Sequence, residues 1–385
     1  MRKLTKKQLN ILVLTRDDDL TARFPNHTRA ALRKMKREEK QLRATGQPHV
    51  PIAAQVEMDE KVKREKDKTK LVDSKYKYLL TENQKLKKEK RIILGIQQPV
   101  VTFTIDPYPE LESESTAFMI ASDWHFEEVV KPQTVSGLNE FNYDVAHYRA
   151  TRFFQNGLLL LNIVNKGTNI KTLVLALLGD FISGNIHNEL IENNRLPPME
   201  AIIEVQREIL SGIEYLLDNT DVNLVIPCHS GNHPRITKKV HLSNEPGNSL
   251  EYFMYCNIAE MYRDNPRVDV IPSMGYHSYM NVYGMKIRFH HGHFIRYQGG
   301  IGGITIPVNK AIAQWNKMVR ADLDVFGHYH QHKDLGDFVC NGSLIGYNTF
   351  ALSIKADYET PRQAFFLIDR DRGKTITAPI LLNGN

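Results

Sequence analysis

The stretch 117-AFMIASDWH-125 joins a short apolar segment to two polar side chains, Asp123 and His125. The stretch 173-LVLALLGD-180 repeats this arrangement, because an apolar run ends there at Gly179 and Asp180. Short apolar runs bounded by glycine and polar residues are typical of buried strands, and the loops that follow strands commonly carry functional side chains. The two stretches therefore predict a sheet whose strand ends carry a polar site.

Beyond about residue 101, predicted strands and helices alternate to the end of the sequence. The other predicted strands are 222–227, 282–290, 323–326, 338–344 and 363–369. The predicted helices are 143–165, 198–217, 249–263 and 307–319. Mixed strands and helices over this length indicate a layered α/β body with sheets inside helices.

Five short polar motifs follow predicted strands in this body. They are D-x-H at 123–125, G-D at 179–180, G-N-H at 231–233, H-H-G-H at 290–293 and G-H-x-H at 327–330. Aspartate, asparagine and histidine supply oxygen and nitrogen ligands, which suit manganese, iron or zinc rather than a thiolate structural site. Seven such ligands are too many for one ion but suffice for two that share a carboxylate, and such a pair can activate water and hold a phosphate.

The order of these motifs resembles that of the calcineurin-like metallophosphoesterase superfamily over roughly residues 116–345. The resemblance implies a two-sheet β-sandwich flanked by helices, and two divalent metal ions: manganese first, with iron, zinc or magnesium as alternatives. It implies that Asp180 bridges the ions and that His233 is a general acid instead of a ligand. The other implied ligands are Asp123, His125 and His330 for the first ion, and Asn232, His291 and His328 for the second.

Two stretches depart from well-known members of that superfamily. Residues 179–184 read GDFISG and residues 231–234 read GNHP, where the protein serine/threonine phosphatases carry G-D-x-x-D-R-G and G-N-H-E. The arginine that would clamp a phosphomonoester is missing, which argues against a protein phosphatase, and the partner that orients His233 stays unassigned. The SbcD-type DNA nucleases, the nearest in kind, carry G-N-H-D, so Pro234 departs from them as well.

Charge is unevenly distributed along the 385 residues. Residues 1–100 hold 26 Lys/Arg and 13 Asp/Glu, a net charge of +13, whereas residues 101–385 hold 24 and 31, a net charge of −7. A basic arm on an acidic body favours a polyanionic partner, and we expect DNA. The alternative is a lysine-rich helix that only favours solubility. A basic head beside a divergent phosphoesterase also suggests a phage or mobile-element protein.

The predicted domains are a basic helix-turn-helix-like domain at 1–43, a linker and charged helix at 44–100, and the metallophosphoesterase domain at 101–385. The head shows three short helical patterns with apolar faces, and the third is basic. A helix-turn-helix unit would place that third helix in the major groove, although a protein-docking or purely structural bundle has the same pattern. The candidate DNA contacts are Arg29, Arg33, Lys34, Lys36 and Arg37.

Residues 72–93 form a heptad-like pattern with polar residues at two of its positions. This pattern predicts either a short coiled coil, and hence a homo-oligomer, or a single helix that packs along the body. No apolar run is long enough for a membrane span, and the three cysteines are too few and scattered for a disulfide framework. The basic start lacks the apolar core of a secretory signal. We therefore expect no membrane partner and a cytoplasmic protein, in the host cytoplasm if phage-encoded.

Three further residues lie beside the motifs and are candidate substrate contacts: His187, Arg235 and His293. Each has an alternative role, as a solvent-facing loop residue or as a support for a ligand. Taken together, the motifs and the basic head predict a metal-dependent phosphodiesterase that hydrolyses DNA. The alternatives are a phosphatase or phosphodiesterase for nucleotides or other small phosphoesters, and a DNA-binding protein with a vestigial site.

Overall fold

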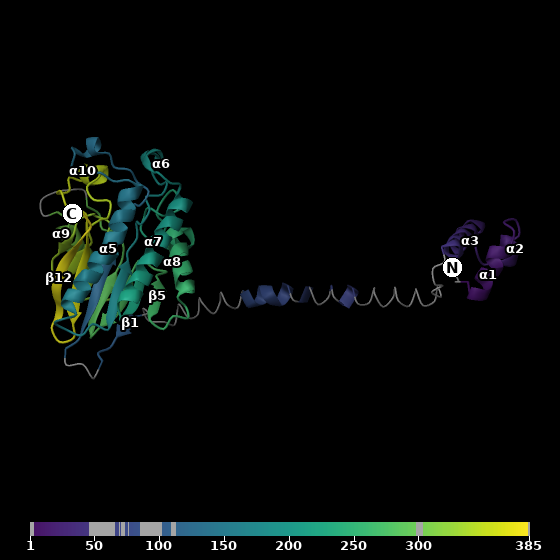
Figure 1. Cartoon of the computed structure of the whole chain (residues 1–385), viewed down its shortest axis with the longest axis horizontal. Helices are drawn as coiled ribbons and strands as arrows, with labels where there is room; N and C mark the ends of the chain where they lie inside the picture. Colours follow the sequence, from purple (N-terminus) through teal and green to yellow (C-terminus); the bar gives the residue numbers. More distant parts are fainter. Residues whose placement is uncertain are drawn as a thin grey trace. The chain divides into compact units, whose positions relative to one another are not determined.

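The structure, a computed structural model, describes residues 4–45, 66–68, 70, 74–75, 77–84, 102–108, 113–297 and 303–383. The chain divides into two compact units, Met1–Gln98 and Pro99–Asn385 (Figure 1). The predicted linker at 44–56 and most of the heptad-like pattern at 72–93 lie outside the described residues. No helix in the described part of the chain is long and apolar enough to cross a membrane.

The first unit contains the three predicted helices, α1 (Lys6–Leu14), α2 (Leu20–Arg23) and α3 (Arg29–Ala44). Thr5 and Thr28 cap α1 and α3, since each side chain accepts a hydrogen bond from the first turn of its helix. The second helix is a single turn. The apolar faces meet in a small core of Leu4, Leu9, Leu12, Leu20, Phe24 and Leu32.

The second unit is built from two six-stranded sheets, which confirms the predicted α/β sandwich. The first sheet has the order β12-β11-β2-β3-β4-β5 and the second β1-β6-β7-β8-β10-β9. The strands of the first sheet are β2 (Ser115–Ala121), β3 (Thr172–Leu177), β4 (Asn223–Cys228), β5 (Val268–Pro272), β11 (Arg362–Asp369) and β12 (Gly373–Leu381). Those of the second are β1 (Thr102–Ile105), β6 (Ser278–Val282), β7 (Met285–Phe289), β8 (Leu323–Phe326), β9 (Lys333–Asp334) and β10 (Phe338–Cys340).

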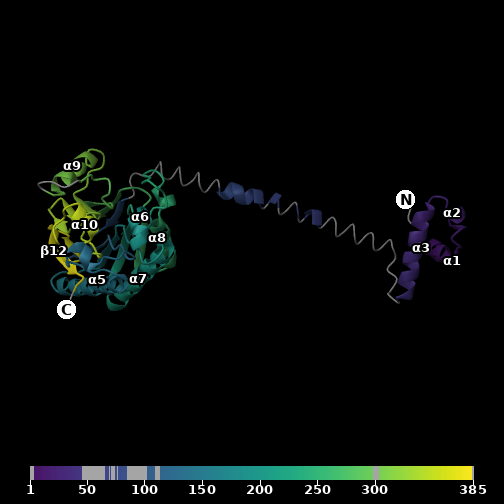
Figure 2. The same ribbon diagram turned by 90° about the horizontal axis from the view of Figure 1, so that it is seen from above.

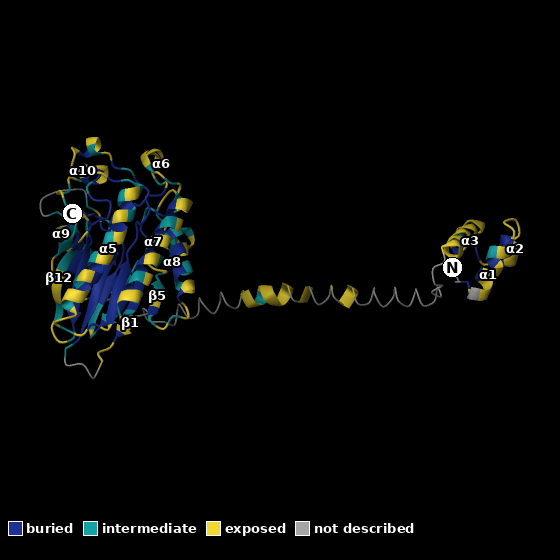
Figure 3. Cartoon of the chain, in the orientation of Figure 1, coloured by how far each residue is buried: buried dark blue, intermediate teal, exposed yellow. Residues whose placement is uncertain are grey.

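Helices cover the outer face of each sheet (Figures 1 and 2). The first sheet is covered by α5 (Tyr143–Val164), α7 (Pro198–Asn219) and α8 (Leu250–Met261), and α9 (Thr305–Trp315) packs on the second. Alternate residues of β2 serve different cores: Ala117 and Met119 contact the helices, whereas Phe118 faces the other sheet and its ring stacks on Phe366. Because strands such as β2 and β3 are buried on both faces, their sequences are continuous apolar runs. Figure 3 shows this buried sheet behind the partly exposed helices.

Two predicted strands have different bounds in the structure. The strand predicted at 282–290 is the second half of a hairpin, because Tyr283 and Gly284 have positive φ values of 51° and 87° and turn the chain between β6 and β7. The strand predicted at 338–344 ends at Cys340, because Asn341 leaves the ladder to hydrogen-bond Ser122. Five of the described strands were not predicted: β1, β5, β6, β9 and β12. Of these, β12 lies at a sheet edge and alternates little in burial.

Strand direction gathers the polar motifs at one end of the sandwich. Strands β2, β3 and β4 are parallel, as are β7, β8 and β10. The residues after β2 and β8 meet, since the His328 amide donates to the Asp123 carboxylate at 2.9 Å. The carboxyl ends of both sheets therefore face one shared region, where two short helices, α6 (Asn188–Asn193) and α10 (Thr349–Ser353), also lie (Figure 1).

Close packing of α5 on α7 gives a first prediction. A Cβ at Gly212 of α7 would collide with the Phe154 ring of α5. We expect Gly212→Ala to lower the free energy of unfolding by about 1–3 kcal/mol, because overpacking outweighs the gain of up to ~1 kcal/mol in helix propensity. Chemical denaturation measures this change. Gly247→Ala is the matched control, since a Cβ there meets no atom within 4 Å, and equal stability of the two variants would contradict the packing.

Candidate metal centre

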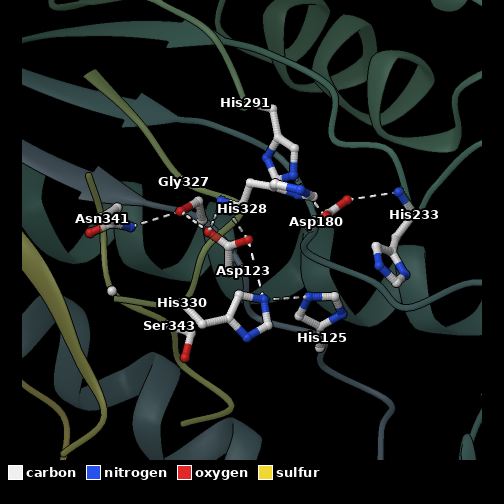
Figure 4. A network of polar contacts seen from close by, with 12 residues as sticks. Asp123, His125, Asp180, His233, His291, Gly327, His328, His330, Asn341 and Ser343 are labelled. Atoms are coloured by element: carbon white, nitrogen blue, oxygen red, sulfur yellow. Dashed lines mark hydrogen bonds and ion pairs between the residues drawn. The ribbon is translucent and has the colours of Figure 1, made fainter. Parts of the chain in front are cut away.

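Seven side chains from loops after five strands, β2, β3, β4, β7 and β8, converge at the shared end of the sandwich (Figure 4). Two groups have ligand atoms that all lie within 4.8 Å of one another: Asp123 with His125 and His330, and Asp180 with His291 and His328. A third such group, of His125, Asp180 and His233, connects the first two. This arrangement can hold two cations on either side of the Asp180 carboxylate, as the resemblance implies.

The backbone of the site lies in a conformation that most residues avoid. Five of the eight described non-glycine residues with positive φ belong to these groups: Asp123, His125, Asp180, His328 and His330. Such residues cost free energy and persist only where the surrounding structure holds them. Their concentration here indicates that the surrounding structure holds these loops in the conformation that points the side chains into the site. Non-glycine residues would otherwise prefer negative φ values.

Asp123 is fixed from two sides. Its carboxylate accepts hydrogen bonds from the His328 amide at 2.9 and 3.0 Å and from the Ser122 hydroxyl at 2.5 Å. Asn341, after β10, donates in turn to that hydroxyl at 2.8 Å. The carboxylate is fully buried, and its Oδ1 lies 3.5 Å from Nε2 of His330. The remaining lone pairs of Asp123 are thus directed toward His330.

A short relay sets the tautomer of His125. The Ser183 hydroxyl donates to Glu128 at 2.9 Å, so it must accept from His125 Nδ1, which lies 2.8 Å away. His125 Nε2 then carries a lone pair and lies 3.2 Å from Nε2 of His330. Burial holds the pKa of His125 well below its usual value, so the ring is neutral. A neutral imidazole with a free Nε2 is the form that binds metal ions.

Asp180 and His291 form the buried centre of the second group. Oδ2 of Asp180 lies 2.8 Å from Nε2 of His291, and Nδ1 of His291 donates to the Leu178 carbonyl at 2.7 Å. Burial by itself would raise the pKa of Asp180, but His291 and His233 hold it well below its usual range. Burial opposes charge on His291, yet Asp180 raises the pKa of that ring to about 10. The space between them therefore attracts positive charge, as a cation site must.

Asn232 is half-buried and lines the same hollow as Asp180, and its side-chain oxygen is buried. Its Oδ1 makes no hydrogen bond among the described residues, and neither does Nδ1 of His330. An unpaired buried amide oxygen is costly and calls for a partner such as an ion. The residue before Asn232 must be a glycine because the loop passes close to Asp180: a Cβ at Gly231 would collide with the Asp180 carboxylate. The donor set and its unpaired oxygen fit divalent cations.

His233 is oriented by backbone groups. Its amide donates to Oδ1 of Asp180 at 2.8 Å, and its Nδ1 donates to the Ser183 carbonyl at 3.0 Å. Nε2 is thereby left to face the central hollow, with the ring 4.8 Å from that of His125. The resemblance places an acidic residue at position 234, where this chain has a proline. Here the Ser183 carbonyl orients the His233 ring instead.

Two supporting residues were not identified from the sequence. Glu251 of α8 is fully buried and accepts from the amides of Phe181 at 2.6 Å and Gly231 at 2.8 Å, so it ties the two metal-ligand loops together. Burial and the nearby Asp180 raise the pKa of Glu251 well above its usual value. Ser183 lies inside a quoted motif, but its double role depends on the fold. The sequence signal that could have identified Glu251 is an acidic residue on the apolar face of the helix predicted at 249–263.

Of the three predicted substrate contacts beside the motifs, His187 lines a hollow of about 500 Å³ at the candidate metal ligands, and His293 and Arg235 line neighbouring hollows. His187 is exposed, with its ring 6.4 Å from that of His233. His293 lies behind the centre, 5.6 Å from the His291 ring, and neither of its ring nitrogens has a hydrogen-bond partner among the described residues. Arg235 lines a neighbouring hollow and donates to the Asn232 carbonyl.

The basic residues of the head lie on α3, where most of them also form ion pairs. Lys36 donates to the Thr15 carbonyl and lies 2.9 Å from Asp17, so it fastens α3 to the end of α1. Its side chain is 13% exposed, so this candidate DNA contact offers little free charge to a phosphate backbone. The other predicted DNA contacts pair at their exposed ends, Arg29 with Asp18, Arg33 with Asp17 and Lys34 with Glu38, while Arg37 is exposed. Exposed pairs of this kind contribute ~1 kcal/mol or less, and a phosphate can replace them.

Comparison with known proteins finds no family model and no curated protein that matches the chain. Solved structures do match over about 70% of it. A predicted phosphoesterase from Streptococcus pneumoniae is 12% identical, with 69% of this chain and 97% of that chain covered and a TM-score of 0.27. A hypothetical protein from Pyrococcus horikoshii is 12% identical, with 69% and 87% covered and a TM-score of 0.32.

A putative 5'-nucleotidase from Staphylococcus aureus is 11% identical, and the match covers 70% of this chain and 55% of that protein with a TM-score of 0.33. Identities and TM-scores this low carry no functional inference. The interpretation of the site rests on its own geometry.

The shared carboxylate gives a second prediction. We expect Asp180→Ala to reduce the manganese content of the purified protein from two ions per chain to below one, because both groups lose a ligand. Elemental analysis after dialysis measures this. Asp221→Ala removes an exposed aspartate near the opposite, amino end of β4 and should retain both ions. Full metal content in Asp180→Ala would contradict a shared ligand.

Proposed function

We propose that this chain is a dinuclear metal-dependent phosphodiesterase of the calcineurin-like kind, and that its substrate is DNA. The observation that carries the proposal is the pair of ligand groups joined through Asp180, with His233 directed into the same hollow. Manganese is the metal we expect first, with iron, zinc or magnesium as alternatives. When bound, two such ions would neutralise a phosphate's oxygens and lower the barrier to attack by water.

The residues of the chain account for the remaining chemistry. Water attacks phosphorus, the bond from phosphorus to the leaving oxygen breaks, and that oxygen needs a proton. His233 lines the hollow and its Nδ1–H is held by the Ser183 carbonyl, so a ring protonated on both nitrogens gives its Nε2 proton to the leaving oxygen and keeps the one on Nδ1. The five strand-end loops would hold a phosphate beside the Nε2 nitrogen, because their side chains are fixed by buried partners.

The charge of the central hollow favours diesters over monoesters. Among the residues that line it, there is no lysine or arginine, and Glu128 and Glu189 contribute carboxylates. A phosphomonoester carries up to two negative charges and normally needs a cationic clamp beyond the metals. A diester carries one negative charge and does not. This agrees with the absence of the phosphatase arginine from residues 179–184.

The choice of DNA as the diester rests on the basic N-terminal unit. A hollow in this unit is lined by one carboxylate, Asp17, and by five basic residues of α3, so it offers net positive charge to a phosphate backbone. The basic residues are Arg33, Lys34, Lys36, Arg37 and Lys40. Salt-sensitive binding of DNA by this unit would bring substrate to the body. Six of the seven predicted ligands lie in the two groups and the seventh, Asn232, lines the same hollow, which argues against a vestigial site.

A cleavage assay tests the proposed function. With manganese, the purified chain should cut linear, circular or single-stranded DNA, and a chelator should stop the reaction. Bis-aryl and mono-aryl phosphates in parallel report the ester preference, and we expect the bis-aryl ester to be the better substrate. Hydrolysis of monoesters alone would favour the alternative, a phosphatase for small phosphoesters. No turnover of any ester by the metal-replete protein would favour a vestigial site.

A separate prediction tests the role of His233. We expect His233→Ala to lower turnover ~10²–10⁴-fold, the usual scale for a lost general acid, while the protein keeps both metal ions. Substrates with a good leaving group need less protonation, so the loss on a bis(nitrophenyl) ester should be smaller than on DNA. Loss of metal from His233→Ala in elemental analysis would show that this histidine is a ligand instead.

A further inference from the structure

Two further hollows adjoin the central hollow at the candidate metal centre. The central hollow shares His328 and Phe350 with a hollow of about 390 Å³ on one side. It shares His233 with a hollow of about 480 Å³ on the other. Because neighbouring hollows share wall residues, a chain-like ligand can pass from one outer hollow to the other over the metal ligands.

Positive charge is confined to the outer hollows. One is lined by Arg296, and the other by Arg235 and Lys238, whereas the central one contains no lysine or arginine. Among the described residues, none of these three cations has a carboxylate within ion-pair distance. Arg235 is held in place by the carbonyls of Asn232 and Thr237. This pattern suits a ligand with one phosphate at the metals and one on each side.

An aromatic ring separates two of the hollows. Phe350 of α10 is 38% exposed, and its ring lies 5.4 Å from that of His330. Tyr297 lines the hollow beyond it, next to Arg296. Exposed aromatic rings between cationic positions are typical of sites for a single nucleic-acid strand, since bases stack on the rings while the backbone follows the charge.

We propose that one polynucleotide strand lies across these three hollows, with the phosphates that flank the scissile one held by Arg296 on one side and by Arg235 and Lys238 on the other. The inference rests on the proposed function and adds the substrate's path and direction. His233 borders the Arg235 and Lys238 hollow, so the fragment that leaves with the protonated oxygen is the one bound there. A base next to the scissile phosphate stacks on Phe350.

The test compares a thymidine dinucleotide, which has one phosphodiester, with a tetranucleotide, whose central phosphodiester has a neighbour on each side. We expect kcat/KM of the full chain with manganese to be at least about tenfold higher for the tetranucleotide. Lys238→Ala and Arg296→Ala should each reduce the ratio of kcat/KM for the tetranucleotide to kcat/KM for the dinucleotide, by up to about tenfold. A tenfold loss is at the lower end of what one hydrogen bond to a charged group contributes. Each variant should also lower the slope of log KM against log salt by ~0.7.

Matched controls remove the same charges outside the three hollows. Lys239→Ala changes an exposed neighbour of Lys238, and Arg320→Ala changes an arginine whose side chain is 83% exposed; both should keep the wild-type ratio. Cleavage of both substrates with equal kcat/KM, or a changed ratio in only one of the two test variants, would overturn the two-sided path while the phosphodiesterase assignment stands. Cleavage of neither substrate would instead overturn the proposed function.

Discussion

The Asp180 carboxylate is the constraint on which the described site depends. One of its oxygens lies 2.8 Å from the His291 ring, and the other accepts the amide of His233. A buried carboxylate with these neighbours needs positive charge beside it, and loops from both sheets supply the groups that share it. The two glycines that flank this contact in neighbouring loops, Gly179 and Gly231, allow it, because a Cβ on either would collide with the facing loop.

Hydrogen bonds from neighbouring residues hold the candidate ligands in place, although the backbone of their loops is strained. Ser183 contributes twice, since its hydroxyl sets the tautomer of His125 and its carbonyl orients His233. Glu251 joins the loops after β3 and β4 through two backbone amides. The same loops border three hollows: the central one has no lysine or arginine, and the two outer ones have Arg296 on one side and Arg235 and Lys238 on the other. This arrangement agrees with the proposed binding of a phosphodiester chain.

The sequence predicts a layered α/β body with polar residues at its strand ends because apolar runs and the polar residues after them are local signals, whereas the two-sheet sandwich is what the resemblance implies. The sequence does not predict the supporting contacts, because these join residues far apart: Ser122 with Asn341, and Phe181 with Glu251. The hairpin at Tyr283 and Gly284 was missed because an apolar strand continues on both sides of the turn. The ion pairs on α3 were missed for a similar reason, since Lys36 reaches residues of a different helix.

The most direct test of the account is anomalous diffraction from crystals soaked in manganese. The account predicts two peaks about 3.5–4 Å apart, one beside Asp123, His125 and His330 and the other beside Asn232, His291 and His328, with Asp180 between them. A single peak, or two peaks that do not share Asp180, would contradict it.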